Sequence, residues 1–152
     1  MGIVEPVAVF SDGGDISGED LERSIAARQK RAEVLDSGRQ FTLIMAEGAL
    51  RWQAVSPTVM ATQLDHLAAL AGRLRIGVIP WTRPTAVFTT HGFSLYDRRT
   101  VILGTRTGTS FITDSRDVAD YVKLFDSLTG LAVFGDDAQA IMTGLADDYR
   151  KL

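Results

Sequence analysis

The sequence FTLIMAEGALRW (residues 41–52) is followed closely by SPTVMATQLDHLAALAGRLRIGVI (residues 56–79), and these two segments decide how the chain folds. The first begins with a short apolar run over 41–46 that is typical of a strand, and we expect 49–52 to extend or kink it past Gly48. The second predicts a helix and then another strand over 75–79. A strand, a crossover helix and a second strand predict two parallel strands.

The helix of the second segment carries signals both for its start and for its buried face. Ser56 is expected to cap it, and Pro57 stands at the first helical position, where a missing N–H costs nothing. His66 lies away from the apolar stripe and is expected to be a surface residue. The apolar residues recur at spacings of three and four, as one helix face requires: Met60, Leu64, Leu67, Ala71 and Leu74.

The rest of the chain alternates between turn residues and short apolar runs. Residues 1–16 have the composition of an irregular segment, and a helix is expected to begin at Ser17. Two further helices are expected to begin near Asp114 and Asp136. Between them and the first two strands we expect an antiparallel meander of four short strands: 86–89, 93–96, 100–103 and 110–113.

These elements predict the α+β class and a single domain over residues 17–152. The domain is expected to hold a mixed, mostly antiparallel sheet packed against several helices, with one β-α-β crossover. A chain of 152 residues is long enough to bury one core of this kind.

Composition indicates an ordinary globular chain, because 45% of the residues are hydrophobic and 23% are charged. No apolar run reaches the roughly 18 residues that a membrane span needs, so we expect no membrane partner. The chain has no cysteine, which excludes disulfides, thiolate zinc sites and cysteine nucleophiles. We expect a cytoplasmic protein.

Charge is distributed unevenly around the net value of −3. Residues 73–113 hold six arginines against one acid, whereas the segments on either side are acidic. This basic middle is either a surface for an acidic partner or nucleic acid, or a set of arginines on the outward face of an exposed sheet. We favour the second interpretation, because the arginines are scattered along the segment.

The sequence offers no positive case for an enzyme, a metal site or a cofactor. His66 and His91 are its only histidines, and they do not have metal-ligand spacing. Residues 104–110 resemble a phosphate loop only in their glycines, and we expect a hairpin turn there. No nucleophile elbow is present, and we expect no catalytic residue.

Glu47 and Arg51 are the charged pair that merits attention. They interrupt an apolar segment four residues apart, which would place both on one face of a strand. The pair is either a recognition site for a ligand or partner, or a structural ion pair. Around it we expect the remaining candidates for ligand or partner binding, which are either pocket walls or core and loop residues: Trp52, Trp81, His91 and Phe93.

Three short motifs carry a resemblance to a known family. They are Glu47-x-x-Leu50-Arg51, then Met60-x-x-Gln63-Leu64-x-x-Leu67, then Val78-Ile79-Pro80 followed by an aromatic residue. Their order resembles the domain that follows an Xre-type helix-turn-helix in many actinobacterial transcriptional regulators, some of them antitoxin-like. The chain departs from the common family pattern at Ile102, Gly104 and Thr109, where many members carry a tyrosine and acids, and at Arg83-Pro84.

The resemblance implies a regulatory domain that binds a ligand or partner. Family members often lie beside genes for small acidic proteins, so a small acidic protein is the expected partner. The alternative is a small-molecule effector in a pocket, and a stand-alone enzyme is a remote third reading. The resemblance further implies that DNA is bound only through a helix-turn-helix domain absent from this chain, which we expect to be a fragment. The oligomeric state is left open, a homodimer included.

Overall fold

A computed structural model describes residues 2–4, 40–105 and 107–152 of the chain. In these residues seven strands form one sheet in the order β6-β5-β4-β1-β2-β3-β7. The strands are β1 (Gly2–Val4), β2 (Thr42–Ala46), β3 (Arg75–Ile79), β4 (Phe93–Tyr96), β5 (Thr100–Thr105), β6 (Gly108–Ile112) and β7 (Val133–Phe134). The helices are α2 (Glu47–Leu50), α3 (Pro57–Ala71), α4 (Ser115–Leu131) and α5 (Asp136–Arg150). The helix expected to begin at Ser17 lies outside the described residues.

The sheet is mixed, and most of its pairings are antiparallel. Strand β2 runs parallel to both β1 and β3, and the remaining neighbours are antiparallel. Helix α3 connects β2 to β3, which confirms the β-α-β crossover. The α+β class predicted from the sequence is therefore correct.

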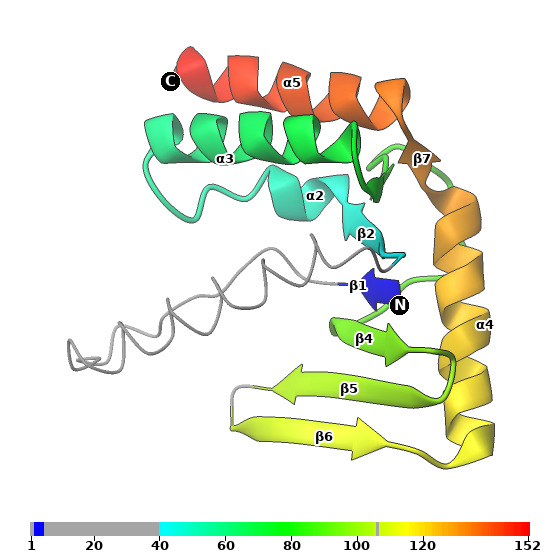
Figure 1. Ribbon diagram of the computed structural model, residues 1–152. Coiled ribbons are helices and arrows are strands. Elements are labelled where there is room, and N and C mark those ends of the chain that lie inside the picture. The colour runs from blue at the N-terminus through cyan, green and yellow to red at the C-terminus, as the bar shows by residue number, and fades with distance from the viewer. Residues whose placement is uncertain (1, 5–39, 106) are drawn as a thin grey trace.

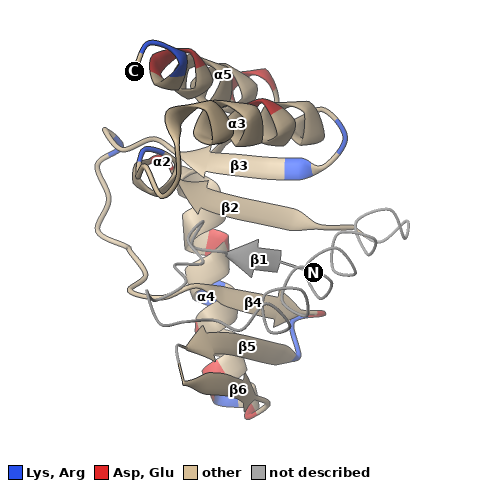
Figure 2. Cartoon of the chain, turned by 90° about the vertical axis from the view of Figure 1, so that its left-hand side faces the viewer, with Lys and Arg blue, Asp and Glu red and all other residues tan. Residues whose placement is uncertain are grey.

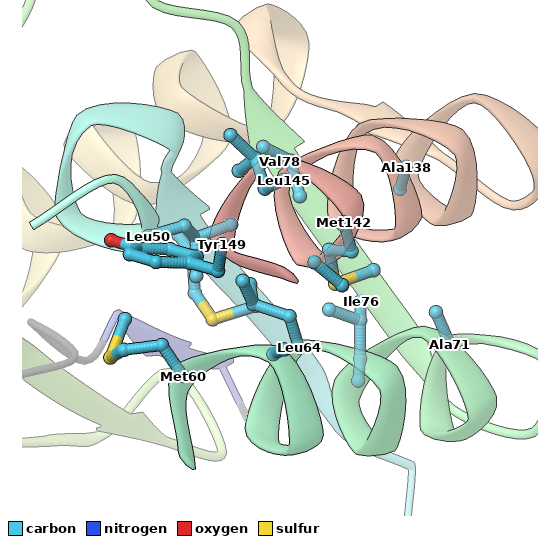
Figure 3. Packing of buried hydrophobic residues seen from close by; sticks show 13 residues of the cluster. Leu50, Met60, Leu64, Ala71, Ile76, Val78, Ala138, Met142, Leu145 and Tyr149 are labelled. Atoms are coloured by element: carbon cyan, nitrogen blue, oxygen red, sulfur yellow. The ribbon is translucent and has the colours of Figure 1, made fainter. Parts of the chain in front are cut away.

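One core lies between the sheet and the helices α3 and α5, which run side by side (Figure 1). Successive residues of a strand point to opposite faces, and Met45 belongs to this core whereas Ile44 belongs to the other one. Figure 3 shows how the predicted stripe of α3 meets α5 and β3. The labelled core residues are Leu50, Met60, Leu64, Ala71, Ile76, Val78, Ala138, Met142, Leu145 and Tyr149.

The second core lies on the opposite face, beneath α4. Asp114 caps this helix by accepting a hydrogen bond from the backbone N–H of Arg116, as the sequence predicts. The helix then buries an apolar face against the strands. The buried residues of this core are Val118, Phe125 and Leu128 from the helix, with Ile44, Phe93, Leu95 and Val101 from the strands.

Two expectations near the start of the chain are wrong. Residues 2–4 are not irregular, because they form β1 between β2 and β4. Residues 49–52 do not extend the strand, because Glu47–Leu50 form a short helical turn, with the N–H of Arg51 bonded to the C=O of Glu47 at 3.0 Å. The turn brings Leu50, only 1% exposed, into the same core as Met45.

Two further expectations fail in the middle of the chain. Residues 86–89 form no strand, because the Thr85 hydroxyl bonds both the N–H and the C=O of Val87 and replaces a ladder partner. Ser56 precedes α3 but its side chain makes no capping hydrogen bond.

Strand β7 was not predicted from the sequence. Gly77 explains why β7 can pair with β3. A Cβ at position 77 would lie 2.5 Å from the ring of Phe134, so glycine is what lets this short strand approach β3. The charged head of Arg75 lies 4.1 Å from the centre of the same ring. A two-residue strand is too short to leave a periodic signal in the sequence.

Candidate functional site

One edge of the sheet gathers most of the residues that the sequence singles out. The parallel strands β2 and β3 both end at this edge, and the antiparallel strand β4 begins there. Consequently the loop over residues 51–56, after α2, and the loop over residues 80–92, before β4, lie at the same edge (Figure 2). We call these two loops together with α2 the carboxyl edge.

Glu47 holds the carboxyl edge together. Its side chain is only 5% exposed, and one carboxylate oxygen accepts from Arg51 Nε at 2.8 Å, with Arg51 Nη2 at 2.6 Å. The other oxygen accepts from the backbone N–H of Trp81 at 3.1 Å. The carboxylate therefore ties α2 to the residue that follows β3, and the predicted pairing of Glu47 with Arg51 is present, although on a helix.

Arg51 links the buried carboxylate to the surface. Its side chain is 45% exposed, and its guanidinium carbon lies 5.7 Å from the centre of the Trp81 ring, within the range of a cation–π contact. Its backbone C=O accepts a hydrogen bond from the Tyr149 hydroxyl at 2.9 Å. Burial raises the pKa of Tyr149, and the positive charge of Arg51 opposes that rise.

His91 and Phe93 belong to a different neighbourhood. The His91 ring lies with Nε2 at 3.0 Å from the Tyr121 hydroxyl and Nδ1 at 3.2 Å from the Thr90 hydroxyl. Phe93 is 2% exposed and meets Tyr121 edge to face, with ring centres 5.0 Å apart. His91 and Phe93 thus contact α4 through Tyr121, whereas Arg51 contacts α5 through Tyr149. Because α4 and α5 cover opposite faces of the sheet, the predicted site residues divide between these two faces.

The carboxyl edge exposes large apolar side chains. Trp81 is 69% exposed and Phe88 is 76% exposed, both in the loop over residues 80–92. Trp52 and Val55 are exposed in the other loop, at 62% and 49%. The exposure of Phe88 was not predicted from the sequence, because a strand was expected over residues 86–89. A half-buried side chain is normal in such a strand.

The charged residues in the two loops of this edge all have the same sign. The two loops contain Arg51 and Arg83 and no aspartate or glutamate. Figure 2 shows the basic residues of this region without acidic neighbours in the loops. Glu47 forms an ion pair with Arg51 and neutralises its charge. The charge of the exposed Arg83 is not part of this pair.

Three hollows that the described residues line are open to solvent. The largest, about 650 Å³, lies beside α4 and is lined by Arg98, Arg99 and Lys123 among others. The others, about 470 and 220 Å³, share Tyr149 and lie at the C-terminal end of α5. Of the predicted site residues, only Arg51 lines any of these three hollows.

The described residues hold neither a cluster of metal ligands nor a membrane-spanning helix. No three side chains among the described histidines, aspartates and glutamates gather as metal ligands would. No helix in the described ranges is both long and apolar enough to cross a bilayer.

Comparison with known proteins identifies a family for this chain. Residues 7–144 match the model of the family described as "Domain of unknown function (DUF5753)". The chain belongs to this family. No curated protein and no solved structure matches the chain. The DUF5753 match covers the carboxyl edge, strands β2 to β7 and the helices α2 to α4, and it ends within α5, while β1 lies outside it.

Proposed function

We propose that this DUF5753 domain is the regulatory half of a helix-turn-helix transcriptional regulator. We further propose that it binds a small acidic partner protein through the carboxyl edge. Support for the regulatory role comes from the motifs around Glu47, Leu64 and Val78, which resemble the domains of such regulators. The role does not require chemistry, and we propose no catalytic residue.

The observation that carries the partner proposal is the exposure of Trp81 and Phe88 on loops without acidic residues. Aromatic residues and arginine are enriched at the centres of protein interfaces and supply most of the binding energy there. A surface with arginine and no carboxylate favours an acidic partner, because like charges are not brought together. In a chain with a net charge of −3, two loops that carry arginine and no acid fit this role.

A small-molecule effector is less well supported. Sites for small molecules enclose most of the ligand surface, whereas the three hollows noted above open to solvent. Exposed aromatic side chains on adjoining loops are typical of a protein interface instead.

The test is a calorimetric titration of the chain with a small acidic protein of the kind proposed here as its partner. We expect the double variant Trp81→Ala/Phe88→Ala to weaken binding by about 10- to 100-fold, the effect of losing interface anchors. Phe111→Ala is the matched control, because Phe111 is 68% exposed on β6, five strands away from β3 in the sheet order. Its affinity should equal that of the wild type.

Two results would contradict the proposal. One is the absence of measurable binding by the wild-type chain. The other is an unchanged affinity in the double variant, provided that its unfolding midpoint shows an intact fold. A tight complex with a small molecule, unaffected by Trp81→Ala, would support the effector alternative.

A further inference from the structure

Strand β6 is an outer edge of the sheet, and in the described part of the chain it pairs only with β5. Its five residues, GTSFI, carry no charge and no proline. Their register with β5 runs through five consecutive residue pairs without a bulge. Proteins protect edge strands with charges, prolines, bulges or short length. The opposite edge, β7, has only two residues, so within the described residues β6 is the edge that lacks protection.

The register shows which backbone groups of β6 face outward. Hydrogen-bonded and non-hydrogen-bonded pairs alternate along an antiparallel ladder. The two-residue loop between Thr105 and Gly108 makes those two residues a hydrogen-bonded pair. Ser110 is therefore also bonded to β5, and the N–H and C=O groups of Thr109 and Phe111 point toward the open edge.

Phe111 adds an apolar surface to this open edge. Its neighbour Ile112 pairs with Val101, which is fully buried beneath α4. Because side chains alternate along a strand, Phe111 points to the other face of the sheet, where it pairs with Ile102 and remains 68% exposed. A large exposed aromatic residue beside unpaired backbone groups is a surface that favours strand addition.

We propose that two copies of this chain associate through β6, antiparallel about a twofold axis at Ser110, so that two sheets become one. In this register Thr109 exchanges both backbone hydrogen bonds with Phe111 of the partner subunit, and the symmetric pair does the same. Each Phe111 ring then lies beside a threonine of the other copy. This surface is separate from the carboxyl edge loops.

A second copy fits this edge for two reasons. An uncharged strand that pairs antiparallel with itself brings no like charges together, and the two edges have the same length. The twofold arrangement is closed, so it consumes both open edges and stops at a dimer. The contact is one strand wide, which places it below the size of stable interfaces, and we expect micromolar association.

Cysteine cross-linking tests the register directly, because the chain has no cysteine of its own. At the twofold axis the two Ser110 Cα atoms would lie roughly 4.5 Å apart, within disulfide reach. We expect Ser110→Cys to form a covalent dimer under mild oxidation. Thr109→Cys is the matched control, because its two copies would lie roughly 8–9 Å apart, beyond the disulfide limit.

Sedimentation analysis over about 5–500 µM measures the association without a cross-link. We expect a wild-type dimer at the upper concentrations and a monomer for Thr109→Pro, because proline removes an outward N–H and leaves the β5 ladder intact. Phe88→Ala, which alters the carboxyl edge, should dimerise like the wild type. A wild-type chain that stays monomeric throughout would overturn the proposal, as would equal cross-linking of Thr109→Cys and Ser110→Cys.

Discussion

At the scale of single residues, the Glu47 carboxylate has the widest structural role. It is almost fully buried, and its partners are Arg51 and the backbone of Trp81. We expect Arg51→Met to lower the free energy of unfolding by about 1–3 kcal/mol, because a buried carboxylate loses its cation. This expected loss of stability lies at the low end of the range for buried ion pairs, because the Arg51 side chain is 45% exposed. Denaturant titration gives this quantity.

Arg83→Met is the control for this substitution, because Arg83 is exposed and it is the backbone N–H of Arg83 that bonds the C=O of Pro80. Its unfolding midpoint should equal that of the wild type. Measuring partner affinity on the same Arg51→Met protein separates recognition from structure. A loss of stability with normal affinity would remove Arg51 from the binding surface, and normal stability would show that Glu47 does not need its cation.

Tyr149 ties α5 to the end of α2, and its ionisation should limit stability at alkaline pH. Burial raises its pKa in the folded state, so its contribution is fully present below the unfolded pKa of about 10 and is lost as the pH rises further. We expect Tyr149→Phe to lose about 0.5–1.5 kcal/mol at neutral pH. The difference from the wild type should shrink above about pH 10. A constant difference across that range would contradict the account.

At the scale of elements, the face of α3 decides stability. Leu64 is 2% exposed between the sheet and α5, whereas His66 points to solvent. Leu64→Ala should cost about 2–5 kcal/mol, because it removes buried methyl groups and leaves a cavity. His66→Ala should change the unfolding free energy far less. Equal losses in denaturant titrations of the two variants would mean that the helix is rotated from the orientation described here.

Elements with a strong hydrophobic period could be predicted from the sequence. Helices α3, α4 and α5 and strands β2 to β6 follow the expected order, because their spacing of apolar residues reflects which face is buried. The hairpin between β4 and β5 turns through Asp97 and Arg98, which adopt positive φ values of 50° and 56°.

Elements that depend on distant partners could not be predicted. Strand β1 has three residues and is defined by β2 and β4, which are far away in sequence. The turn of α2 depends on Leu50 finding the core beneath α5. Both are cases in which tertiary contacts override local propensity. The two-residue β7 likewise needs the space that Gly77 leaves.

At the scale of the whole molecule, the candidate site was predicted in part. The sequence placed Glu47, Arg51 and Trp81 together, and their contacts agree with that. It also placed His91 and Phe93 with them, but these two residues adjoin α4 on the other face of the sheet. Sequence order alone could not show this, because the loop over residues 80–92 crosses from one group to the other.

The arrangement of charge is also a property of the whole molecule. The chain is acidic overall, yet the loops of the carboxyl edge hold arginines and exposed aromatic side chains and no acid. An edge of this composition concentrates the features of an interface for an acidic protein in one place. That edge is the basis of the proposed function.

Backbone hydrogen exchange of the chain, with and without the proposed small acidic partner, tests this central claim most directly. A protein that docks on the carboxyl edge should slow exchange in the loops over residues 51–56 and 80–92, and should leave the helix α4 unchanged. Protection confined to α4 and the hollow beside Lys123, or unchanged exchange in both loops at saturating partner, would contradict the account.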